Sequence, residues 1–219
     1  MTRWFILPAV LLSLTFTGLH AQPPAKSDEK SKSVDAPKSA DTPKPATPPD
    51  AGYYPIKIGT TWTYKVGDKK LSTRVARMEK KGKYDCAVIE TIVDGNVVAN
   101  EHVAVTKEGL YRVANNGQES KEPILFLKLP AKKGESWEVK TDVGGEAVEG
   151  KFTEGEEEIT VPLSKDKLKT VTSAGEFKIN GQDARFTFWL NEKYGIVKQQ
   201  LNVGGQDLLL ELEKFEEGK

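Results

Sequence analysis

From Trp62 onward, turn-forming dipeptides recur along the chain and separate short runs in which apolar and polar side chains alternate. Asp94-Gly95 stands between two such runs, and Asn116-Gly117, Asn180-Gly181 and Gly204-Gly205 repeat the arrangement. Dipeptides of this kind are typical of tight β-hairpins, because both turn residues must accept a positive φ. The turns therefore restrict the chain to consecutive antiparallel strands.

The runs between these turns have the period of two that a strand with one buried face requires. In one of them the apolar residues Phe186, Phe188 and Leu190 alternate with Arg185, Thr187 and Trp189. Residues 71–78 and 208–215 also fit helical spacing, but hairpin turns bound both, so we expect strands there. The sequence predicts an all-β fold, a single antiparallel meander of about 10–11 strands, as a curved sheet, half-barrel or sandwich. No internal repeat supports a propeller or solenoid.

The N-terminus predicts export. Arg3, the apolar run of residues 4–16 and the small residue Ala21 before Gln22 have the order of a cleavable signal peptide, with cleavage between Ala21 and Gln22. The apolar run is shorter than the ~20 residues of a membrane-spanning helix, which favours cleavage over retention as an anchor. No cysteine stands at the cut to carry a lipid. We expect a periplasmic or extracellular protein with no transmembrane segment in the mature chain.

Three segments follow from composition: the signal peptide at residues 1–21, a linker at 22–50 and a β-rich globular domain at 51–219. The linker holds seven of the chain's twelve prolines, and its only large aliphatic residue is Val34. Such a segment buries too little apolar surface to offset its ordering entropy, so we expect disorder with polyproline character. It serves either as a spacer or as a leader with no attachment.

Charge and cysteine content exclude several classes of function. The chain has 32 basic and 32 acidic residues, and losing Arg3 with the signal leaves a net charge of −1. This balance argues against a nucleic-acid partner, which requires a basic patch. The single cysteine, Cys86, forms no internal disulfide, and its apolar surroundings predict a small buried side chain.

The residues that usually carry catalysis are scarce. After signal cleavage His102 is the only histidine, so every histidine-dependent triad must use it; a satisfied, partly exposed strand histidine is the simpler interpretation. One histidine and one cysteine do not make a transition-metal site. The acidic run Glu154–Glu158 lacks the spacing of a calcium loop and is typical of a solvated loop and strand start. No phosphate-binding or nucleophile-elbow motif occurs, and we expect neither an enzyme nor a cofactor.

The remaining candidates for a site are aromatic. Trp62 and Tyr64 share one strand face, as do Phe186 and Phe188. Most large aromatics belong in the core of a β-domain without disulfides. If the sheet curves, however, these four residues could line a pocket for an apolar ligand.

Three stretches resemble a loose group of secreted β-rich bacterial proteins, common in planctomycetes and largely uncharacterised. Residues 53–64 (YYPIKIGTTWTY) resemble the group's YYPLxxGxxWxY opening, residues 171–177 its VxTxAGxF segment, and residues 188–198 its WxAxGVGxVK segment. Asn191 and Tyr194 depart from the last pattern. The group has no agreed catalytic residues, so the resemblance implies an exported β-domain and no particular activity.

Three functional hypotheses follow. The leading one is a non-catalytic exported β-domain with a structural or binding role and an unidentified partner. The alternatives are a carrier or sensor of an apolar small molecule and a carboxylate-based hydrolase. An unfilled aromatic-lined cavity would support the carrier, and two carboxylates about 5–10 Å apart in a cleft would support the hydrolase.

Overall fold

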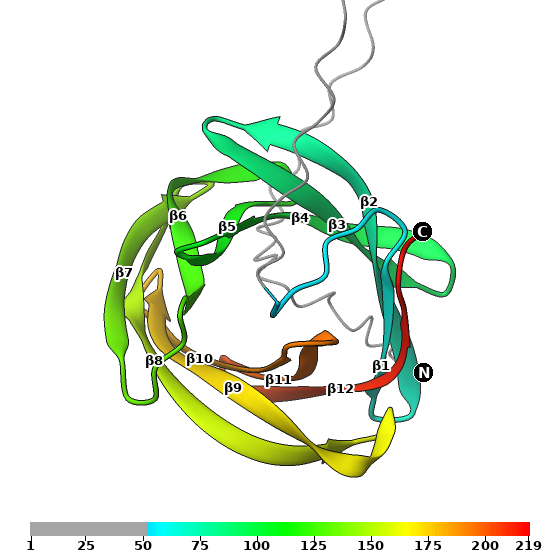
Figure 1. Cartoon of the computed structure of the whole chain (residues 1–219). Coiled ribbons are helices and arrows are strands. Elements are labelled where there is room, and N and C mark those ends of the chain that lie inside the picture. The colour runs from blue at the N-terminus through cyan, green and yellow to red at the C-terminus, as the bar shows by residue number, and fades with distance from the viewer. Residues whose placement is uncertain (1–51) are drawn as a thin grey trace, which may run out of the picture. The chain divides into compact units, whose positions relative to one another are not determined.

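A computed structural model describes residues 52–219, which form a closed antiparallel barrel of twelve strands (Figure 1). The signal-peptide and linker predictions lie outside the described residues. Each strand pairs with the next along the chain, and the last pairs with the first. The strands are β1 (Thr61–Val66), β2 (Lys69–Lys81), β3 (Tyr84–Val93), β4 (Asn96–Thr106), β5 (Gly109–Asn115), β6 (Gln118–Lys128), β7 (Ser136–Val143), β8 (Glu146–Val161), β9 (Ser164–Ile179), β10 (Gln182–Asn191), β11 (Gly195–Val203) and β12 (Gln206–Glu216).

This architecture confirms the all-β antiparallel meander and decides between its predicted forms. There are twelve strands rather than 10 or 11, and the sheet closes through the pairing of β1 with β12, from Thr61↔Glu216 to Lys65↔Glu211. The two segments with ambiguous spacing belong to β2 and β12 and are strands, as expected. No helix among the described residues is long and apolar enough to span a bilayer.

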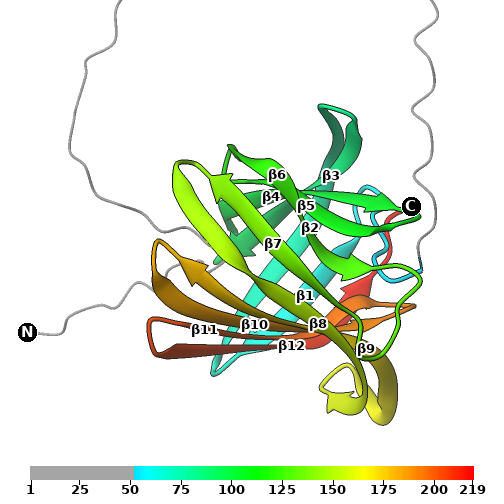
Figure 2. The ribbon, with the colours of Figure 1, turned by 90° about the vertical axis from the view of Figure 1, so that its left-hand side faces the viewer.

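The two ends of the barrel differ in their connections (Figure 2). Six two-residue turns lie at one end, among them Asp94-Gly95, Asn116-Gly117 and Asn180-Gly181. At these turns Asp94, Asn116 and Asn180 have φ of 50°, 48° and 48°, as a hairpin of this type requires. The opposite end carries the seven-residue connection between β6 and β7, the turn between β10 and β11, and the C-terminus.

Side chains that face inward at alternate positions of the strands fill the interior of the barrel. Trp62 and Tyr64 of β1 are buried, whereas Lys65 is exposed. The Trp62 indole N–H donates to the Tyr194 carbonyl at 2.7 Å, and the Tyr64 hydroxyl donates to the Ile196 carbonyl at 2.9 Å. These bonds satisfy the polar atoms of two buried aromatic side chains, so the rings can pack in the core without loss of hydrogen bonding.

The segment before β1 passes inside the ring of strands (cyan in Figure 1). Tyr54 and Ile56 of this segment belong to the buried core, and the Tyr54 ring stacks on Trp62 at 5.3 Å between centroids. Gly59 adopts a φ of 88°, which permits the chain to turn into β1. The sequence motif around Tyr54 and Trp62 therefore closes one end of the core.

Candidate functional site

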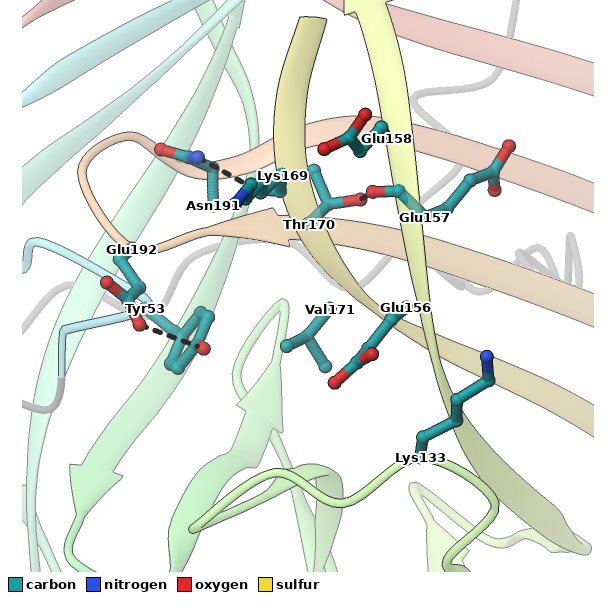
Figure 3. A pocket seen from close by; sticks show the side chains of 10 residues that line it. All are labelled: Tyr53, Lys133, Glu156, Glu157, Glu158, Lys169, Thr170, Val171, Asn191 and Glu192. Atoms are coloured by element: carbon teal, nitrogen blue, oxygen red, sulfur yellow. Dashed lines mark hydrogen bonds between the residues drawn. The ribbon is translucent and has the colours of Figure 1, made fainter.

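A polar cleft of about 560 Å³ lies at the end of the barrel with the longer connections (Figure 3). We refer to it as the end cleft. Its lining comes from the segment before β1, the β6–β7 connection, β8, β9, and the end of β10 with the turn that follows it. The lining residues are Tyr53, Lys133, Glu156, Glu157, Glu158, Lys169, Thr170, Val171, Asn191 and Glu192.

The ladder between β8 and β9 fixes the acidic wall of the end cleft. Glu156 pairs with Val171, Glu157 with Thr170, and Glu158 with Lys169. The Thr170 hydroxyl also donates to the Glu157 carbonyl at 2.7 Å. Because both strands are 16 residues long, this wall is regular backbone with a defined register. The predicted solvated loop and strand start is therefore wrong about the loop, whereas Glu156–Glu158 are exposed strand residues.

Glu154 holds the loop that forms the opposite wall. Its side chain is buried, and its two carboxylate oxygens accept the backbone N–H groups of Lys128 at 2.9 Å and Lys132 at 2.7 Å. Burial raises the pKa of Glu154, while these two hydrogen bonds act in the opposite direction. The Gly134 N–H also donates to the Glu154 carbonyl at 2.8 Å. These bonds position the loop that brings Lys133 to the end cleft.

Two further contacts complete the rim. The Tyr53 hydroxyl donates to Glu192 Oε1 at 3.2 Å, and burial together with the nearby Glu192 carboxylate raises the pKa of Tyr53. The Asn191 amide donates to the Lys169 carbonyl at 2.9 Å, which joins the end of β10 to β9. The rim therefore depends on segments that lie far apart in the sequence.

Only some of the charged side chains of the end cleft have hydrogen-bond partners among the described residues. Glu157 accepts the Trp189 indole N–H at 2.7 Å, and Glu192 accepts Tyr53. Within residues 52–219, the side chains of four lining residues make neither a hydrogen bond nor an ion pair: Glu156, Glu158, Lys133 and Lys169. These exposed charges remain available to groups of opposite sign.

The glutamates of the end cleft do not gather into one cluster (Figure 3). Among the described residues, no group of three or more histidine, cysteine, aspartate or glutamate side chains is placed to hold a metal ion. Figure 3 shows Glu156 and Glu158 extending toward different parts of the cleft. The acidic run thus supplies separate carboxylates along a wall.

The four aromatic residues proposed from the sequence as pocket lining lie in the core. The relative solvent exposure is 0% for Trp62, 2% for Tyr64, 8% for Phe186 and 3% for Phe188. Their burial confirms that each pair points to the same side of its strand. None of them lines the end cleft, and their role in binding an apolar ligand stays a prediction.

His102 and Cys86 also lie away from the end cleft. Cys86 is fully buried, as expected, and burial raises the pKa of its thiol to about 11. His102 differs from the expectation of partial exposure, since only 5% of it is exposed, and its Nε2 lies 3.4 Å from Glu79 Oε2. The Glu79 side chain of β2 reaches it across β3, a contact that strand alternation alone does not reveal.

No family model matches this chain, and no curated protein matches it either. Two solved structures resemble the fold. One is an inferred exported protein with a YmcC-like fold from Bacteroides fragilis, with a TM-score of 0.49 and 12% identity, covering 75% of this chain and 98% of the other. The second is an inferred lipoprotein from Parabacteroides distasonis, with a TM-score of 0.46 and 11% identity, covering 74% and 97%. The resemblance to the planctomycete group stays a prediction.

Proposed function

We propose that this protein is an exported, non-catalytic binding module and that the end cleft binds a ligand carrying several ammonium groups. The observation that carries the proposal is the pair Glu156 and Glu158, two carboxylates that face the cleft without a partner among the described residues. The lining as a whole holds four glutamates and two lysines, a net charge of −2.

The position of these charges on a regular wall favours binding over mere solvation. The β8–β9 ladder fixes the backbone from which Glu156 and Glu158 extend, and Glu154 fixes the loop opposite. Each exposed ion pair contributes little, about 0–1 kcal/mol, so a ligand needs more than one positive charge to bind measurably. The affinity should fall as salt increases, because the screening length is about 10 Å at 0.1 M.

The alternatives receive less support from this site. A carboxylate-based hydrolase requires two carboxyl groups on either side of the scissile bond, and no described contact pairs the four glutamates of the end cleft in this way. An apolar carrier requires an apolar pocket, whereas Val171 is the only aliphatic residue in the lining. A polar, charged ligand therefore fits the end cleft better than an apolar ligand or the substrate of a hydrolase does.

Calorimetric titration with spermidine tests the proposal. The double variant Glu156→Gln with Glu158→Gln should bind spermidine about tenfold more weakly, since two of its charge contacts are lost. Glu176→Gln is the matched control, because Glu176 is an exposed glutamate of β9 outside the end cleft. No binding of spermidine at low salt, or an equal loss in the control, would refute the proposal.

Export rests on the signal sequence and has a separate test. The full chain expressed in a bacterium should be recovered from the periplasm or medium with Gln22 as its first residue, as intact-mass measurement would show. Recovery of the uncut chain from Met1 would overturn cleavage after Ala21.

A further inference from the structure

One junction of the barrel lacks a continuous backbone ladder. Between β6 and β7 the described residues form a single backbone pair, Ser120↔Val143, whereas β7 and β8 form eight. We refer to this junction as the β6–β7 seam; the two strands are labelled in Figure 2. An interrupted ladder leaves backbone N–H and C=O groups that need other hydrogen-bond partners.

Side chains of β7 supply these partners. The Thr141 hydroxyl accepts the Glu122 N–H at 2.9 Å and donates to the Glu122 carbonyl at 2.8 Å. Farther along, the Trp137 indole N–H donates to the Leu125 carbonyl at 2.8 Å. A hydrogen bond of this kind contributes about 1 kcal/mol net. The side chains of Thr141 and Trp137 and one backbone pair therefore join β6 directly to β7. Ser173 of β9 and Glu154 of β8 bond two further backbone groups of β6, the Phe126 carbonyl and the Lys128 N–H. With a single backbone pair, we expect the β6–β7 seam to separate at a lower cost than a complete ladder.

A row of aromatic rings lies behind the β6–β7 seam. Trp137 of β7 packs on Phe152 of β8 at 5.7 Å between centroids, Phe152 on Phe177 of β9 at 4.9 Å, and Phe177 on Phe186 of β10 at 5.8 Å. The last three are buried, whereas Trp137 is partly exposed at the seam. Separation of β6 from β7 would therefore uncover the Trp137 end of this aromatic row.

We propose that the barrel opens laterally at the β6–β7 seam and admits an apolar small molecule to the aromatic row. This inference concerns a different site and ligand class from the end cleft and does not depend on it. Regions held by few backbone bonds open at lower free energy than the rest of a fold. The rings offer flat apolar surface, which suits a ligand with an aromatic ring or an acyl chain.

The sequence of β6 favours a small ligand over a partner strand. Lys121, Glu122 and Pro123 follow one another at the seam. Charged residues and proline on a strand edge oppose pairing with another chain, because they disfavour a continuous new ladder. Once opened, the edge is therefore poorly suited to strand addition, while the rings behind it stay available.

Amide hydrogen exchange of the full chain tests the opening. The backbone amides of residues 121–126, apart from Pro123, which has no N–H, should exchange at least tenfold faster than those of β9. Thr141→Val keeps the side-chain shape but removes both bonds to Glu122, and it should speed this exchange about fivefold further. Thr187→Val is the control, since Thr187 of β10 is paired with both neighbouring strands, with Gln200 of β11 and Ala174 of β9. Equal protection of β6 and β9 in the wild-type protein would overturn the proposal.

A reversible cross-link tests ligand entry. The register of Ser120↔Val143 places Glu122 opposite Thr141, so Glu122→Cys with Thr141→Cys, in a Cys86→Ser background, spans the β6–β7 seam. The reduced form should bind the apolar fluorophore 1-anilinonaphthalene-8-sulfonate, and the oxidised form should bind it at least tenfold more weakly. Equal binding by both forms, or none by the reduced form, refutes entry at the seam. If the cross-link does not form, Thr141→Val should bind the fluorophore more tightly than wild type, and unchanged binding refutes the proposal.

Discussion

Replacement of Arg112 by methionine tests how the barrel stabilises charge in its interior. The Arg112 Nε donates to Glu101 Oε2 at 2.7 Å, and the side chains are only 15% and 8% exposed. The guanidinium also lies over the Phe126 ring, 5.7 Å from its centroid. Methionine retains the aliphatic contact with this ring and removes the charge, so the substitution isolates the ion pair.

The expected cost follows from what the substitution leaves behind. Removing one partner of a buried ion pair typically costs about 3–5 kcal/mol, because the other charge remains buried without compensation. Since Arg112 retains some exposure, the free energy of unfolding should fall by about 3 kcal/mol, the lower end of this range. The uncompensated carboxylate would be that of Glu101, whose charge already raises the pKa of the buried Tyr54 and Tyr64, after the larger effect of burial.

Unfolding in urea, monitored by tryptophan fluorescence, measures this change in the free energy of unfolding. The double variant Glu101→Gln with Arg112→Met should lose only about 1 kcal/mol relative to wild type, because no buried charge is left unpaired. A loss below 1 kcal/mol for Arg112→Met alone would refute the reasoning. So would a double variant whose loss equals the sum of the two single losses, since independent residues behave in that way.

Three further predictions concern the core and the end cleft. A Cβ at Gly175 would lie 2.4 Å from Phe177 and 2.6 Å from Phe152, so Gly175→Ala should lower the free energy of unfolding by about 1–3 kcal/mol in urea titration; an unchanged midpoint would contradict this packing. Cys86, with its pKa raised to about 11, should react with a thiol reagent at pH 8 at least 100-fold more slowly in the native protein than in urea. Because the pKa of Glu154 is raised in the folded protein, folding favours the protonated form of this side chain. The free energy of unfolding of wild type, relative to that of Glu154→Gln, should therefore increase as pH falls from 7 toward 4.5 in urea titrations. A difference that stays constant with pH would argue against the raised pKa.

Local chemistry made the strands and turns of this barrel predictable. Asp94, Asn116 and Asn180 stand at positions that need positive φ, and the period of two around Phe186 and Phe188 marks the buried face of β10. The number of strands was harder to predict from the sequence. The polar first half of β6, residues 118–123, has no apolar alternation, yet it belongs to a strand whose first two residues pair with β5 and whose third pairs with β7.

Closure of the barrel depends on a contact that no local pattern encodes. β1 and β12 pair across almost the whole length of the domain, and the choice between a sandwich and a barrel rests on that pairing. Closure also explains why the four aromatic residues proposed as pocket lining pack in the core. Inward-facing rings from strands on different sides, such as Trp62 and Phe188, meet one common cluster once the sheet closes.

The end cleft was visible in the sequence only as an acidic run. Glu156 and Glu158 belong to that run, but Tyr53, Lys133 and Glu192 reach the cleft from other parts of the chain. Their convergence follows from the direction of the strands: alternate connections of an up-and-down barrel meet at the same end. The sequence thus offered the carboxylates without the opposite wall, and a solvated strand start was the simpler interpretation.

The seven-residue connection between β6 and β7 adjoins both proposed sites. Glu154 bonds the backbone of Lys128, the last residue of β6, and that of Lys132, the neighbour of Lys133 in the end cleft. One buried carboxylate therefore bonds both the end of β6 and the loop of the end cleft, beside the junction where β6 and β7 form a single backbone pair. Strands joined by two-residue turns elsewhere in the described barrel form longer ladders.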